Sequence, residues 1–433
     1  MIWLLIGYMW LFIHRPFEVW PWLAAYRIER VFMICTLLYW AILAEKRWLS
    51  CRANLPVFLL AATLLLASAT SPYAGFYYVE DWFKILVFYV LLITSIRTER
   101  DLKILVAAFV CITALYELHS LREFFCGRYQ YEMGVKRMVG VDATHNHPNS
   151  FGASVVYALP FLYPAWVLAV KRWQKLAVAG AFVLGVGCVL LTGSRSSFAG
   201  LGALLLGGVW LSPYRWKVLP ALALAAPLVF FSLRPDLQNR YLSLIDPSKG
   251  VGAAEGSARG RTASFLDGMK SFAEDPFFGA GLGSYRAKTG FATHNVYNEA
   301  MGELGILGLL VLAGFAWAFG RDYLEARRLY AGGKGDWSNL CAAPEGPFRQ
   351  IRPVPFSPAD ETFLYSVCTA AIGTSLLLFF LGYGQHNLMR YNWLWCGAFS
   401  GAAVYFLRQR VYEQVYRAED KSMEPANALN YGT

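Results

Sequence analysis

Long apolar runs alternate with short polar segments along almost the whole chain of 433 residues. Unbroken Leu, Ala, Val and Phe runs predict membrane-crossing helices, because a helix satisfies its own backbone hydrogen bonds in lipid. The pattern therefore predicts an all-α polytopic membrane protein with about 12 transmembrane helices. The expected helices are 2–13, 31–44, 55–70, 82–96, 102–118, 150–170, 176–192, 197–211, 217–232, 300–319, 361–382 and 392–407.

The composition agrees with a membrane location. Hydrophobic residues make up 57% of the chain and charged residues only 16%, too little charge to cover the surface of a soluble protein. The first residues, MIWLLIGYMWLF, have no basic segment and no small-residue cleavage site, so we expect a retained first helix. The eight cysteines show neither a CxxC spacing nor a disulfide framework.

Basic residues gather in alternate short loops. Because Lys and Arg mark the cytoplasmic ends of membrane spans, both termini are expected in the cytoplasm. The net charge of +10 then indicates cytoplasmic anchors and an anionic ligand, and no nucleic acid partner is expected. The basic segments are 46–52, 97–103, 171–175, 215–217 and the tail from 408, whereas 71–81 has no basic residue.

This orientation brings four unusual polar segments to the periplasmic face. They are DATHNHPN (142–149), TGSRSS (192–197), the long loop 233–299 and GYGQHN (382–387). Among them, only the long loop is large enough to form a cap. Histidines and an arginine are therefore expected to gather on one face, although the charge rule did not require it.

The same pattern divides the chain into four parts. We expect an N-terminal transmembrane bundle of about nine helices over 1–232, followed by the periplasmic cap 233–299. The transmembrane helices of 300–407 include a cytoplasmic loop, 320–360, and 408–433 forms a cytoplasmic tail. Glycines at Gly302, Gly305 and Gly308 have a spacing that lets another helix approach closely.

Two groups of arginines are candidates for anion binding. Arg195 in LLTGSRSSFAG interrupts two apolar runs, and a charge at that depth is usually functional, although a snorkelling arginine at a helix end is the alternative. Arg259 and Arg261 lie in EGSARGRTASF, which could be a solvated loop or a short helix. An arginine fork suits phosphate oxygens, so the two groups together could form an anion site.

His294, in THNVYNEAMGELGILG, is the candidate base. A neutral imidazole can take a proton from a hydroxyl near physiological pH, and the alternative is a hydrogen-bonded histidine at the membrane interface. Asn295 or Asn298 could orient the ring, since Asn298 lies at helical i, i+4 spacing. Glu299 or Glu303 could set its tautomer.

Two other His-Asn segments, 145–149 and 386–387, raise the question of a metal site. No HxxxH or histidine–carboxylate ligand spacing is present, so no metal is expected. Helix capping by Asn149 or Ser150 is the favoured role for the first segment.

Four motifs together resemble the O-antigen ligase/polymerase superfamily. They are RMVGVDATHNHPNSFG, TGSRSS, GRTASF with EDPFFGAGLGSY, and HN followed after nine residues by GILG. Phe265 stands where the family usually has tryptophan, and Arg137 and Asn149 belong to the first motif as supporting residues. The opening HRPFEVWPW looks more like the ligase-like proteins found beside exosortase and exopolysaccharide loci.

The resemblance implies a metal-independent GT-C-type glycosyltransferase of the bacterial inner membrane, without a cofactor and with one large periplasmic loop. Its donor would be a glycan on undecaprenyl pyrophosphate, and its acceptor a hydroxyl of the lipid A core or a related surface molecule. Mapped by motif, Arg195 and Arg261 would bind the pyrophosphate and His294 would activate the acceptor. Arg259, and less strongly Arg286, is the alternative to Arg261.

Other functions fit the same features. A polymerase would join the donor to another lipid-linked repeat, and a protein O-oligosaccharyltransferase would use Ser or Thr hydroxyls. A transporter of lipid-linked glycan would need polar residues at mid-membrane and paired broken helices, and we find neither in the sequence.

Overall fold

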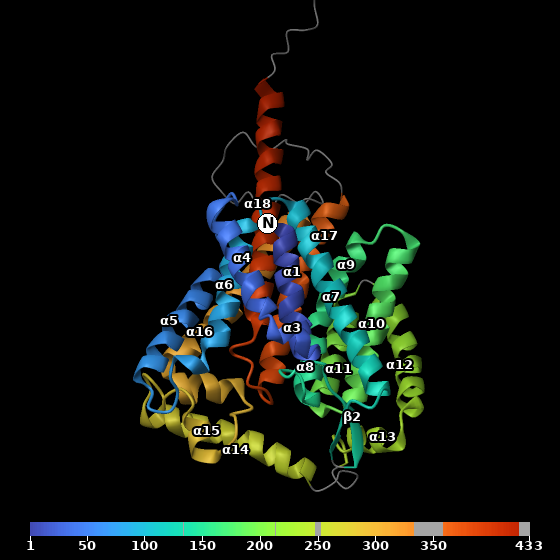
Figure 1. The fold of residues 1–433 in the computed structure, drawn as a ribbon. Coiled ribbons are helices and arrows are strands. Elements are labelled where there is room, and N and C mark those ends of the chain that lie inside the picture. Colours follow the sequence, from blue (N-terminus) through green and yellow to red (C-terminus); the bar gives the residue numbers. More distant parts are fainter. Residues whose placement is uncertain (133, 213, 247–252, 333–357, 424–433) are drawn as a thin grey trace, which may run out of the picture.

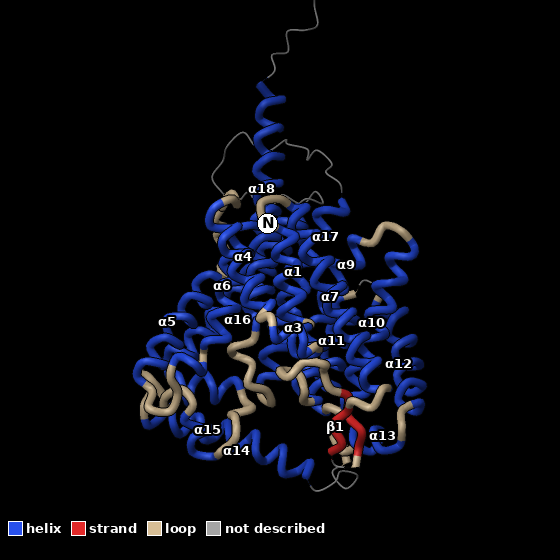
Figure 2. Tube along the Cα trace, viewed as in Figure 1, coloured by secondary structure: helices blue, strands red, loops and turns tan. Residues whose placement is uncertain are grey.

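The computed structural model describes residues 1–132, 134–212, 214–246, 253–332 and 358–423. It is a bundle of helices with a group of shorter helices and one small hairpin at one end (Figures 1 and 2). The long segments are α1 (Ile2–Ile13), α4 (Ile28–Ile42), α5 (Asn54–Thr70), α6 (Glu80–Ser95), α7 (Glu99–Phe125), α8 (Pro148–Ala158) continuing through η2 (Leu159–Phe161) into α9 (Leu162–Leu168), α10 (Arg172–Thr192), α11 (Arg195–Leu211), α12 (Arg215–Ser232), η4 (Asn298–Gly302) continuing into α16 (Glu303–Gly332), α17 (Pro358–Gly382) and α18 (Tyr391–Met423).

Each of the twelve expected ranges falls on one of these helical segments. Among the described residues, six segments are long and apolar enough to cross a membrane, and α5 and α11 are shorter apolar helices. The chain is therefore a multi-pass helical membrane protein, while the count of twelve spans stays a prediction. Residue 1 and the C-terminal part of α18 lie at the same end of the bundle (Figure 1).

Several elements were not expected from the apolar pattern. The polar loop 233–299 is largely helical where it is described, and α16 runs on to Gly332, so the first part of the expected linker 320–360 is helix. Helix-forming Glu, Arg and Leu residues extend α16 and α18 beyond their apolar runs. Residues 333–357 and 424–433 lie outside the described residues. The additional elements are α2 (Pro16–Val19), α3 (Pro21–Ala25), η1 (Phe76–Tyr78), β1 (Tyr129–Glu132), β2 (Val135–Met138), α13 (Pro235–Leu242), α14 (Ala253–Glu274) and α15 (Ser284–Thr289).

A close backbone approach joins the α14–α15 region to the start of α16. The amide of Ile306 donates to the carbonyl of Pro276 at 2.8 Å, and the amide of Ala280 donates to that of Gly302 at 2.7 Å. A Cβ added at Gly305, whose φ is 63°, would lie 2.6 Å from the carbonyl carbon of Phe277. The non-helical segment around Phe277 therefore packs directly against the backbone of Gly305. Only glycine allows both the positive φ and this close contact.

Another helix does approach at the neighbouring glycine. A Cβ at Gly302 would lie 2.7 Å from the Cα of Gly268 on α14. Asn298 donates from Nδ2 to the carbonyl and hydroxyl oxygens of Ser264, at 2.7 and 3.0 Å. Small residues and a buried amide therefore seat α14 across the start of α16, as the glycine spacing predicted for this position.

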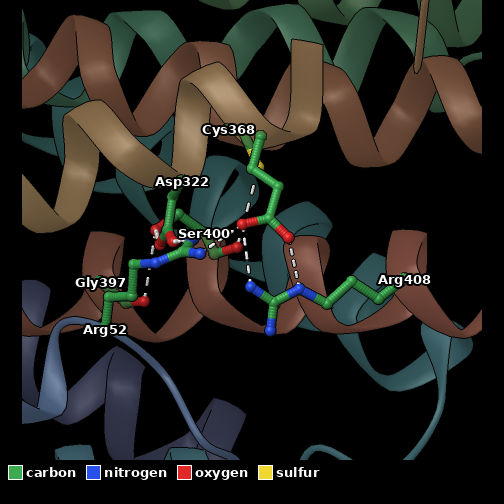
Figure 3. Close-up of polar contacts among 7 residues, drawn as sticks. Arg52, Asp322, Cys368, Gly397, Ser400 and Arg408 are labelled. Atoms are coloured by element: carbon green, nitrogen blue, oxygen red, sulfur yellow. Dashed lines mark hydrogen bonds and ion pairs between the residues drawn. The ribbon is translucent and has the colours of Figure 1, made fainter. Parts of the chain in front are cut away.

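Ion pairs among α16, α18 and the segment before α5 hold the opposite end of the bundle together, and Figure 3 shows those around the buried Asp322. Arg52 Nη1 lies 2.7 Å from Asp322 Oδ1, and its other terminal nitrogen contacts Glu325. Arg408 donates to Glu325 from Nε to Oε1 at 2.5 Å and from Nη2 to Oε2 at 2.9 Å. The hydroxyl of Ser400 donates to Asp322 Oδ2 at 2.9 Å. Basic residues of the expected cytoplasmic set also form the pairs Lys103–Asp360, Arg410–Glu99 and Arg97–Glu45.

We predict that Arg52→Ala destabilises the protein by about 3–5 kcal/mol, because it leaves the carboxylate of Asp322, only 2% exposed, buried without its cation. Arg97→Ala is the matched control. It removes an arginine from an exposed pair, with Arg97 50% and Glu45 75% exposed, and should cost less than about 1 kcal/mol. Unfolding in detergent micelles, followed by tryptophan fluorescence, measures both. Equal losses in the two variants would contradict the buried-pair interpretation.

Candidate active site

An open pocket of about 680 Å³ is lined by residues of the hairpin and of α8, α11, α13, α14 and α15. The hairpin and the helices α13 to α15 lie at one end of the bundle (Figure 1). All four polar segments expected on one face contribute to the pocket. Its lining includes Glu132, Arg137, Thr144, His147, Asn149, Ser150, Arg195, Arg240, Arg261, Tyr285, Phe291, Thr293, His294, Gln385 and His386.

Arg195 is placed by the turn between α10 and α11. Gly193 ends α10 with a φ of 57°, and the hydroxyl of Ser194 caps α11 by accepting from the amide of Ser197. Arg195 is therefore the first residue of α11, half-buried in the pocket wall, with Nη1 3.5 Å from the hydroxyl of Ser243. The polar TGSRSS turn thus points the guanidinium into the pocket, where a snorkelling arginine would instead lie along the lipid surface.

Arg240 was not a candidate in the sequence, yet it lines the same pocket. It lies on α13, and its Nε donates to the carbonyl of Gly193 at 2.5 Å, directly beside Arg195. Burial and the charge of Arg195 lower the pKa of Arg240. The sequence gives only a weak indication of Arg240, because PDLQNRYL shows no more than a short polar helix after the apolar run of α12.

Arg137 and Asn149, the supporting residues of the first motif, contact each other. Arg137 is buried on β2 and donates from Nη2 to Asn149 Oδ1 at 2.8 Å and from Nε to the carbonyl of Thr192 at 2.9 Å. It also pairs with Glu132. Burial, then the nearby Arg240, lowers the pKa of Arg137 to about 10, so it stays cationic at neutral pH. Arg137 thereby ties the hairpin to α8 and to the turn that carries Arg195.

The structure separates the two arginines of α14. Arg261 lines the pocket, and burial together with the charge of Arg195 lowers its pKa. Arg259 is exposed and is not among the pocket residues, because residues two apart point about 200° from each other around a helix. Arg286, the weaker alternative, is exposed on α15 and also lies outside the pocket lining.

His294 lies on the pocket wall in an unusual backbone conformation. Its φ is 44°, and the helix begins only at Val296. A non-glycine residue with positive φ is strained and is concentrated at functional sites. Burial, then the charge of Arg261, lowers the pKa of His294. The imidazole is therefore neutral at pH 7 and able to accept a proton.

The expected helical spacing of His294 and Asn298 is wrong, because His294 precedes the helix. Asn295 Oδ1 accepts from the amides of Tyr297 and Asn298, at 2.9 and 3.3 Å, and so caps that helix. Asn298 instead binds Ser264, as described above. The hydrogen bonds of the two asparagines thus fix the segment that follows His294, and none of those described above goes to its ring.

The two glutamates are buried and hold backbone segments rather than the imidazole. Glu299 Oε2 accepts from the amide of Leu388 at 3.2 Å. Glu303 accepts from the amides of Gly283 and Tyr285, at 3.0 and 3.2 Å. Glu299 therefore fixes the turn before α18, and Glu303 fixes the approach to α15.

Two further histidines face the pocket. His147 caps α8, because its Nδ1 accepts from the amide of Asn149 at 3.2 Å. The expectation of a cap from Asn149 or Ser150 is therefore wrong, and the Asn149 side chain serves Arg137 instead. His386 lies on the turn between α17 and α18, with its ring centroid 5.2 Å from that of His294.

These features define a class: a helical multi-pass membrane protein with an arginine- and histidine-lined pocket at one end. Residues 180–313, which include Arg195, Arg261 and His294, match the O-antigen ligase family. The exopolysaccharide production protein ExoQ of Rhizobium meliloti (strain 1021) is similar, with 25% identity over 235 residues, or 49% of this chain and 52% of that protein. The match thus spans about half the length of that relative. Both comparisons confirm the resemblance to the O-antigen ligase/polymerase superfamily that the motifs indicated.

The effect of the Arg261 charge on the pKa of His294 should be measurable. Diethyl pyrocarbonate modifies neutral imidazole, so the rate of modification at His294 should follow a pKa below the ordinary value of about 6.5. Arg261→Gln removes a nearby positive charge, which makes protonation easier and raises that pKa. The modification rate of the variant should therefore fall at a higher pH than that of the wild type.

Mass spectrometry of the peptide containing His294 measures this rate between pH 5 and 8. Arg259→Gln, on the same helix but outside the pocket lining, is the matched control and should leave the profile unchanged. If the modification of His294 in Arg261→Gln follows the same pKa as in the wild type, or a lower one, the electrostatic coupling is contradicted.

Proposed function

We propose that this protein is a glycosyltransferase that moves a glycan from undecaprenyl pyrophosphate to a hydroxyl of an acceptor on the periplasmic face of the inner membrane. The observation that carries the proposal is the convergence of Arg195, Arg240 and Arg261 with His294 in one pocket. Guanidinium forks match phosphate oxygens, and a neutral imidazole is suited to accept a hydroxyl proton.

The reaction assigns a separate task to each kind of residue. The arginines bind the pyrophosphate and stabilise the negative charge that grows on it as the bond to the anomeric carbon breaks. His294 takes the proton of the acceptor hydroxyl while the oxygen forms the new bond to that carbon. In-line attack inverts the anomeric centre. The arginine charges provide the stabilisation that a divalent cation supplies in other phosphate-leaving reactions, so the proposal includes no metal ion and no cofactor.

The membrane orientation follows from the charges at the two ends of the bundle. The end opposite the pocket holds the basic loops, including Arg52, Lys103 and Arg408. Positive residues mark cytoplasmic ends, so both termini are proposed to be cytoplasmic and the pocket periplasmic. A lipid-linked donor would then enter from the outer leaflet.

The lead acceptor is a hydroxyl of the lipid A core or a related surface molecule, which makes the protein a ligase. A polymerase that extends another lipid-linked repeat is the second candidate, because the similar protein from Rhizobium meliloti is named for exopolysaccharide production. Transfer to protein Ser or Thr and membership of the exosortase-associated branch stay predictions of the sequence. A transporter of lipid-linked glycan would not need a neutral imidazole beside the arginines.

Purified protein, lipid-linked donor and acceptor in EDTA should give glycan transfer. We predict that His294→Gln lowers kcat by about 10²–10⁴, the usual contribution of a general base. Arg195→Gln and Arg261→Gln should each lower kcat by about 10²–10³, since each removes a donor that stabilises the leaving group. Chromatography of the labelled glycan product measures all three.

Arg259→Gln is the matched control for Arg261→Gln and should retain wild-type transfer, because its side chain is exposed outside the pocket lining. Each variant must show the wild-type elution profile in detergent. Near-full activity of folded His294→Gln would remove the general-base assignment, and equal losses in the two α14 variants would remove the pocket assignment of Arg261.

A further inference from the structure

His386 lies beside His294 in the pocket lining but has no task in the reaction described above. The two ring centroids are 5.2 Å apart and the ring planes are inclined by 57°. In the part of the chain that the structure describes, neither ring is hydrogen-bonded to a protein group. Both imidazoles therefore line the same pocket without a hydrogen bond to a described protein group.

The turn that carries His386 is held rigidly. On one side, Gln385 Nε2 donates to the carbonyl of Asn149 at 3.2 Å, which ties the turn to α8. On the other side, the amide of Leu388 donates to the buried carboxylate of Glu299. Because α8 contributes Asn149 and Ser150 to the pocket lining and η4 follows shortly after His294, these bonds set the position of His386 relative to His294.

A buried polar network fixes the far end of the same turn. Arg390 Nη1 lies 2.9 Å from His145 Nε2 and donates to the hydroxyl of Ser154 at 3.1 Å. His145 Nδ1 in turn lies 2.8 Å from Asp142 Oδ2. Satisfied buried networks of this kind specify one conformation, and a ring mounted on such a frame is preorganised for binding.

We propose that His294 and His386 together hold two neighbouring hydroxyl groups of one sugar ring, so that the acceptor is a saccharide diol. This inference rests on the proposed function and names the chemical class of its acceptor. His294 engages the hydroxyl that attacks, and His386 determines specificity by binding the hydroxyl beside it.

The distance between the rings suits this assignment. A nitrogen-to-oxygen hydrogen bond is about 2.9 Å long, so rings 5.2 Å apart can each reach one of two oxygens on adjacent carbons. A Ser or Thr side chain offers a single oxygen and would leave one imidazole without a partner. Sites built to bind a hydroxyl reject ligands that lack it, because the polar group of the site is then left unpaired.

His386 is also in a suitable protonation state. Partial burial, then the charge of Arg390 and the neighbouring His294 and His147, lowers the pKa of His386 to about 4. A neutral imidazole has one donor and one acceptor nitrogen, so it can bind a hydroxyl in either direction. During transfer His294 keeps the proton of the attacking hydroxyl, the electron pair of the broken bond leaves on the pyrophosphate, and His386 neither gains nor loses a proton.

The test uses purified full-length protein, undecaprenyl-pyrophosphate-linked glycan and three acceptor probes: methyl hexosides, the same hexosides lacking one hydroxyl beside the reacting one, and a Ser/Thr-rich peptide. Removing that hydroxyl should raise the acceptor KM of the wild type about ten-fold, the effect of one lost hydrogen bond. His386→Phe should raise the KM for the intact hexoside by a similar factor and should show no further increase with the deoxy hexoside. The kcat and the donor KM should not change.

His386→Gln, which keeps a donor and an acceptor, should recover part of the acceptor affinity. Met389→Leu is the matched control, because it lies on the same turn and packs against the core, and it should behave as wild type. The proposal is overturned if His386→Phe leaves the acceptor KM unchanged, or if the deoxy penalty persists in that variant. It is also overturned if kcat falls as in His294→Gln, or if the peptide is the acceptor. In these four cases the wild type still transfers glycan, whereas a wild type that transfers to no probe contradicts the proposed function itself.

Discussion

The contact between two backbones at the start of α16 governs the position of the candidate site. Gly302 and Gly305 admit α14 and the segment 276–280 so closely that a side chain at either position would collide with main-chain atoms. Two backbone hydrogen bonds close this contact, so the polar groups exposed by the break in the helix are satisfied. From this joint the chain continues backward to His294 and forward into the bundle. Without this contact, α14 would not pack against α16, and the pocket would lose the side that α14 forms.

The pocket concentrates like charges. Burial lowers the pKa values of Arg137, Arg240 and Arg261, and a neighbouring arginine adds to each shift: Arg240 for Arg137, and Arg195 for the other two. These guanidinium groups repel one another, and the repulsion costs stability in the absence of an anion. A pyrophosphate would relieve it, because its oxygens accept several charge-assisted hydrogen bonds at once. Burial and the charge of Arg261 together lower the pKa of His294 and keep its imidazole neutral, so Arg261 serves both the leaving group and the base.

Much of the architecture could be predicted because lipid imposes simple rules. Apolar runs located all twelve helical segments, and the polarity of the loops grouped the residues of the pocket on one face. Helix ends could not be predicted in this way, since α16 and α18 continue into polar sequence. Arg195, Arg261 and His294 each stand in a recognisable motif. Arg240 does not, and the segment with His386 was expected on the same face without a role, so only the folded chain shows that both residues lie close to the others. The expected spacing of His294 and Asn298 failed because His294 has a left-handed backbone conformation and lies before the helix begins.

One face of α14 sets the position of the donor-binding Arg261 relative to the proposed base, His294. Arg261, Ser264 and Gly268 follow one another at helical spacing, and they reach the pocket, the carbonyl of Thr293 beside His294, and the start of α16 in turn. One inserted residue between Arg261 and Gly268 would rotate the guanidinium by about 100° around the helix axis while Gly268 stayed seated. Length is therefore constrained in this stretch more strongly than composition. Natural variation here should replace residues without adding or removing them.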